Sequence, residues 1–486
     1  MKKVMKFFRK IHQITGSAIV LFFLMWLVTG LVLLYHPYPR VTEDMVYEKK
    51  EELPSSLPSL SSIQDRVDGE IRRLSLKQFQ GQTLFFVATK DSAYVLNTDS
   101  TESVKPITFQ TVQEIAHRWV DAPVLRVDTL HEREQWILYT RYDKAMPIYK
   151  FHFDDDAKTE LFVSGKTGEV QQLTTRSERF WAWVGAIPHK LYIPSLRMHT
   201  EVWQNTISII SGICLLAALS GWVFGIYLWF NRYRKKHVWE NPYKKRWYRW
   251  HFTFGMIFGI FLIGWALSGI FAMQKVPQWM VSTEGEYTFK SSRLWGMKPL
   301  PISSYQLDYR TLKEVYPDLK EVEWTHFGPI PAYRLVSENT ELYVDASGQD
   351  IRPLQIPQEV IKSGFQKIHG ADTPITISLM TESDNYYLSR RLPLPLPVYK
   401  VEVEDANESV YYVSPETGYV RYLNKNKVVR KWLFNAIHYL DIDWLLARPW
   451  LWTICIWTLC IGCGVVCTTG LILGCKKWFK KRRKQS

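Results

Sequence analysis

Four histidines at matched positions are the residues of this sequence whose type and spacing could do chemistry. The chain has 486 residues and twelve histidines. His12 and His251 come just before two apolar stretches, and His189 and His438 come before two others. A neutral imidazole is a common metal ligand and also binds haem iron axially. Whether these histidines form sites depends on the elements that carry them.

An internal duplication relates the four histidines. From His12 and from His251, a Gly, a Trp, a Thr or Ser and a second Gly follow at offsets of 4, 14, 17 and 18. From His189 and from His438, a Trp stands at −6, a Trp at +14, a Ser or Thr at +31 and a Gly at +32. The soluble segments repeat as well, with Pro147-Ile-Tyr149-Lys150 matching Pro397-Val-Tyr399-Lys400, and Thr167-Gly168 matching Thr417-Gly418. Such regular self-similarity predicts two related halves.

Four apolar stretches predict transmembrane helices. They cover residues 16–35, 206–230, 252–273 and 452–474, and none contains an acidic or basic side chain. A bilayer core of about 30 Å needs roughly 20 such residues in a helix. The first stretch is long and lacks a small-residue cleavage site after it, so we interpret it as an uncleaved anchor and not as a secretory signal.

The net charge of +14 is concentrated beside these stretches. Residues 1–11 carry +5, residues 231–250 carry +7 and residues 476–486 carry +7, so the rest of the chain carries −5. An excess of Lys and Arg marks cytoplasmic loops. We therefore predict a multi-pass membrane protein with cytoplasmic termini and large extracytoplasmic domains. Attraction to anionic lipid explains the charge, and no nucleic-acid partner is predicted.

The predicted fold class is α+β, with four transmembrane helices in two parallel repeats. Short alternating runs and turn motifs predict antiparallel strands in both large segments, and residues 111–119 and 358–369 predict single helices. The predicted order is transmembrane helix 1 (1–36), extracytoplasmic domain 1 (37–200), transmembrane helix 2 (201–230), a basic cytoplasmic loop (231–250), transmembrane helix 3 (251–274), extracytoplasmic domain 2 (275–445), transmembrane helix 4 (446–475) and a basic cytoplasmic tail (476–486).

Parallel repeats imply a pseudo-twofold axis along the membrane normal. His12 and His251 would then meet near the cytoplasmic face, and His189 and His438 near the outer face. Two facing neutral imidazoles are what a six-coordinate haem iron requires. We therefore predict two haem b groups, with each histidine pair as axial ligands, and an electron path across the membrane. His36 and His199 are reserve ligands for the outer haem.

Several motifs resemble the PepSY-associated transmembrane family. The family's first helix is similar to Arg-Lys-Ile-His12 through Thr29-Gly30 and to Arg249-Trp-His251 through Ser268-Gly269, and its Leu-His before a late helix is similar to Ile437-His438 and Pro188-His189. The hairpins at Gly168 and Gly418 resemble the closing hairpin of a PepSY domain. Together these motifs cover nearly the whole chain in the family's order.

The resemblance implies an iron-regulated inner-membrane protein, similar to di-haem reductases of ferric siderophores. The family often has a basic residue ten positions after the late histidine. Arg448 stands there in this chain, which makes it a candidate partner for a haem propionate, whereas His199 stands at the matching place in the first half.

Two functions of different classes follow. The first is a di-haem oxidoreductase that passes electrons to ferric iron, in a siderophore or another chelate, on the outer side during iron acquisition. The sequence has no dinucleotide fingerprint, so a nicotinamide or flavin donor would belong to a partner. The alternative is a non-enzymatic accessory or regulatory protein whose PepSY domains bind a protein partner. A carrier is disfavoured because the apolar stretches contain no acid or base. Haem content separates the first two.

Overall fold

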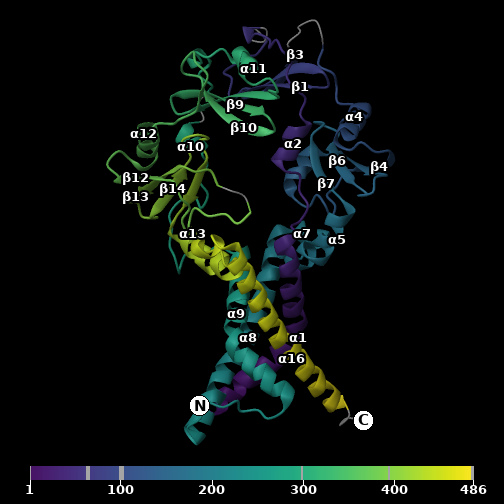
Figure 1. Ribbon diagram of the computed structural model, residues 1–486, viewed down its shortest axis with the longest axis vertical. Coiled ribbons are helices and arrows are strands. Elements are labelled where there is room, and N and C mark those ends of the chain that lie inside the picture. Colours follow the sequence, from purple (N-terminus) through teal and green to yellow (C-terminus); the bar gives the residue numbers. More distant parts are fainter. Residues whose placement is uncertain (1, 62–65, 98–102, 297–298, 392–393, 483–486) are drawn as a thin grey trace.

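The computed structural model describes residues 2–61, 66–97, 103–296, 299–391 and 394–482, with side chains to residue 477. Four long helices form a bundle at one end of the molecule, opposite the β-sheets (Figure 1). They are α1 (Lys2–Tyr35), α8 (Thr200–Lys236), α9 (Arg246–Met273) and α16 (Pro449–Arg482). Each contains one predicted apolar stretch and is long and apolar enough to cross a membrane, which confirms that prediction.

The bundle has an apolar core and an apolar surface. Its core includes Phe23, Leu262, Ala266, Cys463 and Cys467 from three of the helices. Large apolar side chains also point outward, among them Leu21, Val28, Ile209, Ile257 and Ile461, each more than half exposed. A protein in water seldom exposes so much apolar surface, and these helices are suited to a lipid environment.

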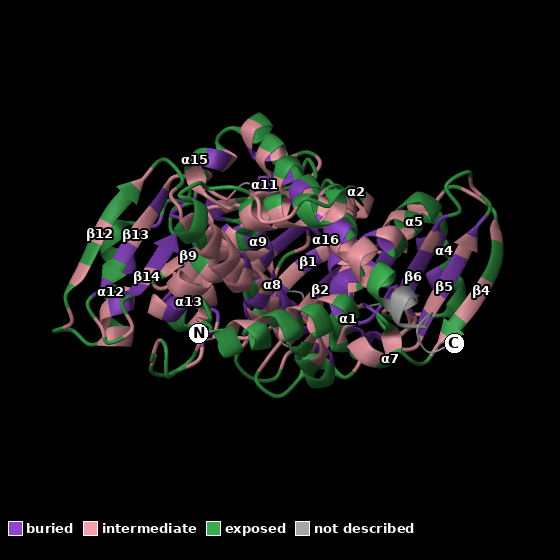
Figure 2. Cartoon of the chain, turned by 90° about the horizontal axis from the view of Figure 1, so that it is seen from below, coloured by how far each residue is buried: buried purple, intermediate pink, exposed green. Residues whose placement is uncertain are grey.

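Two four-stranded antiparallel sheets flank the bundle axis, one on each side (Figure 2). The first comprises β4 (Val124–Leu130), β5 (Ile148–Phe153), β6 (Glu160–Ser164) and β7 (Val170–Thr174), and the second comprises β12 (Ile375–Met380), β13 (Val398–Val403), β14 (Ser409–Val413) and β15 (Val420–Leu423). In both, neighbouring strands in sequence are neighbours in the sheet.

One helix packs on each of these sheets. Helix α4 (Phe109–Trp119) buries Val112 and Ile115 against the first sheet, and α12 (Gln358–His369) buries Ile361 and Phe365 against the second. Both helices were predicted from the sequence. Gly168 and Gly418, which end the hairpin turns after β6 and β14, have φ angles of +70° and +66°, a region that favours glycine.

A seven-stranded sheet joins the two halves of the chain at the far end of the molecule (Figure 1). Its order is β11-β10-β9-β8-β1-β2-β3. The strands are β1 (Arg73–Phe79), β2 (Gln82–Ala88), β3 (Ala93–Asn97), β8 (Glu321–Phe327), β9 (Ile330–Ser337), β10 (Thr340–Asp345) and β11 (Arg352–Pro353). At the centre, β1 pairs antiparallel with β8, with Leu74 opposite Trp324 and Leu76 opposite Val322, all four of which are buried.

Short helices connect the sheets to the bundle. After β7 come α5 (Arg176–Val184), α6 (Ala186–Lys190) and α7 (Pro194–Arg197), and after β15 come α13 (Lys425–Arg430), the π-helix η4 (Lys431–Ala436), α14 (Ile437–Tyr439) and α15 (Asp443–Leu446). The remaining elements are α2 (Glu43–Lys49), α10 (Ser292–Trp295), α11 (Leu312–Val315), η1 (Thr140–Ala145), η2 (Ile302–Ser304) and η3 (Tyr309–Thr311). Helices α6 and α14 contact α1 and α9 respectively, and they carry His189 and His438.

Candidate functional site

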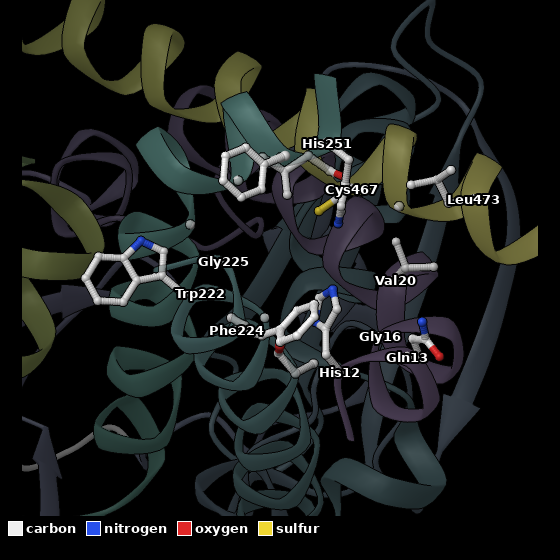
Figure 3. A pocket seen from close by; sticks show the side chains of 18 of the residues that line it. His12, Gln13, Gly16, Val20, Trp222, Phe224, Gly225, His251, Cys467 and Leu473 are labelled. Atoms are coloured by element: carbon white, nitrogen blue, oxygen red, sulfur yellow. The ribbon is translucent and has the colours of Figure 1, made fainter. Parts of the chain in front are cut away.

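The first histidine pair lies inside the bundle near the ends of the helices that are farthest from the sheets. His12 of α1 and His251 of α9 point toward each other, with ring centroids 6.0 Å apart and an angle of 31° between the rings (Figure 3). They line a pocket of ≈ 240 Å³ together with residues of all four long helices, including Phe23, Gly221 and Gly470. We refer to it as the inner pocket.

The second pair lies where the short helices α6 and α14 enter the bundle. The ring centroids of His189 and His438 are 6.1 Å apart, and their planes are at 63°. They line a pocket of ≈ 300 Å³, which we call the outer pocket. Phe23 lines both pockets, so this one side chain lies between them.

The same ring nitrogen is engaged in all four histidines. Nδ1 lies 2.9 Å from Ala217 O in His12, 3.2 Å from Val466 O in His251, 3.2 Å from Trp26 O in His189 and 2.9 Å from Ser268 Oγ in His438. A carbonyl oxygen only accepts, so Nδ1 carries the proton in His12, His251 and His189. In His438 it does so when the Ser268 hydroxyl donates to Trp265 O, 2.9 Å away. Nε2 is left with a free lone pair, the form in which imidazole ligates a metal.

Burial keeps the outer pair neutral. His189 and His438 belong to the short helices α6 and α14 and not to the four long ones. Desolvation lowers the pKa of both imidazoles, because a charged ring loses hydration among the apolar side chains of the pocket. The neutral form, in which imidazole ligates iron, is therefore favoured.

The matched Ser/Thr-Gly dipeptides support the imidazoles. Thr29 Oγ1 lies 3.3 Å from His189 Nδ1, and Thr469 Oγ1 lies 3.1 Å from His251 Nδ1. The glycine of each dipeptide leaves room for a ring: a Cβ added at Gly30 would come within 3.0 Å of His189, and one added at Gly221 would come within 2.4 Å of His12. The sequence showed that these dipeptides recur, but it did not predict what they contact.

The spacing of both pairs fits two imidazoles that bind one iron from opposite sides. A metal–imidazole bond is about 2 Å, and the ligating nitrogen lies about 1 Å from the ring centroid, so the centroids should be about 6 Å apart. Two buried polar atoms of the outer pocket, Trp26 Nε1 and Ser211 Oγ, have no hydrogen-bond partner among the described residues. The donor set, the spacing and the largely apolar lining fit a bound haem.

Basic side chains stand at the edges of both pockets. Arg9 and Lys477 line the inner pocket, and Lys190 and Arg391 line the outer one. Guanidinium and ammonium groups are the usual partners of carboxylates such as haem propionates. The sequence analysis did not single out these four residues, although Lys190 directly follows His189 and Arg9 is one helical turn from His12.

The structure does not bring the other predicted residues to the pockets. Arg448 is exposed, and its Nη1 donates to Trp444 O. The reserve residue His36 stacks on Trp181, with centroids 4.2 Å apart, and His199 is exposed at the start of α8. Of the predicted site residues, the structure therefore gathers the four paired histidines.

The fold and the pockets define a membrane protein of mixed helix and sheet with four long apolar helices. Residues 75–302, which run from β1 to beyond α9, match the family described as PepSY-associated TM region, the family that the motifs resemble. No curated protein matches the chain significantly.

Proposed function

We propose that the protein is a di-haem oxidoreductase of the bacterial inner membrane that passes electrons to ferric iron in a chelate on the outer side during iron acquisition. The observation that carries this proposal is that the four imidazoles form two facing pairs, with ring centroids 6.0 Å apart in one pair and 6.1 Å apart in the other. In every ring, Nδ1 has a hydrogen-bond partner on the protein. That arrangement leaves four Nε2 atoms as ligands for two iron centres.

The chain's own residues hold and orient the two groups. A haem b at each pair would supply one-electron exchange between ferric and ferrous iron. The four histidines ligate, and their Nδ1 partners fix the tautomer and the ring orientation. Arg9 and Lys477 at the inner pocket, and Lys190 and Arg391 at the outer one, would pair with the haem propionates.

Orientation and symmetry are part of the same proposal. The basic segments put the bundle end with the termini in the cytoplasm and the sheets outside. The two four-stranded sheets support a duplication, because the turn glycine of each lies beside the last residue of a strand of the shared sheet. A Cβ at Gly168 would meet Phe79 of β1, and one at Gly418 would meet Phe327 of β8. The inner histidine pair then faces the cytoplasm.

The net reaction is the one-electron reduction of chelated Fe³⁺ to Fe²⁺. We propose that the electron comes from a reduced flavin or nicotinamide cofactor on a separate cytoplasmic protein. Such a donor gives up two electrons, so it reduces two ferric ions, and its protons remain on the cytoplasmic side. The chelate loses no atom in the step.

The test is the haem content of the purified protein. Protein made with ample haem should contain two haem b per chain, measured as pyridine haemochrome, and should reduce a ferric chelate when its haem is reduced. His251→Ala and His438→Ala should each retain one haem and lose chelate reduction. The double variant should insert into the membrane without haem, because insertion depends on the apolar helices. Wild-type protein without haem would refute the proposal and favour the accessory protein.

A further inference from the structure

A third cavity lies where the second four-stranded sheet meets the bundle. Its volume is ≈ 200 Å³, and α13, η4 and residues 385–388 supply most of its lining. Arg430 shows how deep the cavity lies along the bundle, because its Nε donates to Phe271 O and its Nη2 to Ala272 O, near the end of α9. The cavity is therefore at the sheet-side end of the membrane-spanning part.

Four cations and one carboxylate line this cavity. The cations are Arg421, Lys427, Arg430 and Lys431, and the carboxylate is Asp441. In the part of the chain that the structure describes, none of the four cations is within ion-pair distance of a carboxylate. Four cations against one carboxylate give the lining an excess of positive charge, which attracts an anion.

The Lys431 ammonium shows most clearly what the cavity lacks. Its Nζ lies 4.0 Å from the centre of the Trp432 ring and 5.8 Å from that of Tyr386, and the atom is buried with no hydrogen-bond partner among the described residues. An ammonium has three donors, and leaving them unpaired in a buried place is unfavourable. An oxyanion within the cavity would accept from them.

The cations are specific to the second half of the chain. The residues 249 positions earlier hold the matching places relative to His189. They are Gln172 for Arg421, Glu178 for Lys427, Trp181 for Arg430 and Ala182 for Lys431. The matching positions of the first half thus carry no positive charge, so the cation cluster is a feature of the second half alone.

One helical segment separates this cavity from the outer pocket. Residues 425–439 form α13, η4 and α14 in succession. Phe434 and His438 line the outer pocket, whereas Lys431 and Asn435 line the cavity. A helix with its side chains is about 10 Å across, so a ligand in the cavity would lie about that far from the outer histidine pair. The segment also contains the π-helix, a feature that often marks functional sites.

We propose that the cavity binds the oxyanion groups of a small ligand, and that this ligand is a carboxylate-bearing ferric chelate. The second part rests on the proposed function, whereas oxyanion binding does not. In the step, chelated Fe³⁺ would gain one electron and become Fe²⁺. The electron would come, by way of the haems, from the reduced flavin or nicotinamide of the separate cytoplasmic protein. The carboxylates keep their charge, and no bond to the protein forms.

Gallium citrate tests the binding site without any redox reaction, because Ga³⁺ has the charge of Fe³⁺ and is not reduced. Isothermal titration of the detergent-solubilised full chain, without added phospholipid, should show binding to wild type. Lys431→Gln should weaken it about tenfold or more, as expected for a lost charge-assisted hydrogen bond. The control is Lys425→Gln in the same helical segment, since Lys425 donates to Ala406 O outside the cavity. The affinity of this variant should stay within about twofold of wild type.

The other arms identify the source of the oxyanion. An uncharged gallium trihydroxamate should bind at least about tenfold more weakly than gallium citrate, because it offers no free carboxylate. Competition by anionic lipid in nanodiscs, together with no citrate binding in detergent, would assign the cavity to a lipid headgroup and overturn the chelate assignment. Equal citrate affinity of wild type and Lys431→Gln would overturn the site itself. If wild-type protein made with ample haem holds none but still binds gallium citrate, the proposed function is refuted and oxyanion binding stands.

Discussion

Replacing Gly221 by alanine tests whether the inner pocket was shaped around His12. The added Cβ would lie 2.4 Å from His12 Nδ1 and 2.5 Å from Cε1. Ordinary contacts between such atoms are about 3.4 Å or longer, so the ring has to move by about 1 Å. Metal–ligand distances tolerate only about 0.2 Å. The shift also pulls Nδ1 away from Ala217 O, so His12 should cease to be an axial ligand.

The expected magnitude is the loss of one haem of two. Gly221→Ala should give one haem b per chain by pyridine haemochrome, with the spectrum of the outer site unchanged. Alanine favours a helix over glycine by about 1 kcal/mol, so α8 itself should form at least as well as before. Loss of haem in this variant alone therefore reports the contact with His12 and not a weaker helix.

Gly212→Ala is the matched control. Gly212 lies in the same helix α8, and a Cβ there meets no atom within 4 Å. This variant should retain two haems. A Gly221→Ala protein that also retains two haems would refute the reasoning that the glycine makes room for the ligand. Loss of haem in both variants would show that alanine in α8 disturbs the bundle generally.

The remaining predictions concern the reserve ligand, the hairpin, the cavity and the orientation. His36→Ala should retain two haems, because His36 stacks on Trp181 away from the outer pocket; loss of one haem would make it a ligand. Gly418→Val should lower the thermal midpoint by an amount that corresponds to at least about 2 kcal/mol, because φ is +66° and a Cβ meets Phe327 at 1.9 Å, whereas Gly348→Val, with open space around it, should have little effect. Gallium citrate affinity should fall between pH 7 and 9, because burial and the neighbouring guanidinium groups lower the pKa of Lys427 to about 8 and its charge is lost above that pH; a flat profile would contradict this. A reporter fused after Arg234 should be cytoplasmic, and an outside signal would contradict the proposed orientation.

The parts of the fold set by local composition were predictable. Runs of apolar residues specify the four long helices whatever the rest of the chain does, and amphipathic spacing specifies α4 and α12. The turn glycines were predictable for the same reason, since only a residue that tolerates positive φ suits those hairpins. The histidine pairs needed one further step, the assumption that repeated residues meet across an axis.

Contacts between distant segments were not predictable. Nothing in residues 73–79 indicates that their free edge pairs with residues 321–327, because strand propensity does not encode a partner. The basic residues at the pockets show the same limit. Arg391 reaches the outer pocket from the loop between β12 and β13, whereas Arg448, chosen by its spacing from His438, lies on the surface. The spacing of two residues along the chain predicts where their side chains point only when both lie in the same helix or strand.

The pairing of β1 with β8 has a mechanical consequence. Transporters built from parallel repeats work by rocking one repeat against the other, so that the membrane-embedded site opens alternately to either side. Here the halves are joined at both ends, by helix packing in the bundle and by a backbone hydrogen-bond ladder over four residue pairs in the far sheet. Rocking that moved the halves apart at the sheet end would break this ladder. The ladder therefore opposes such a motion, and an electron path of the kind proposed above would need none.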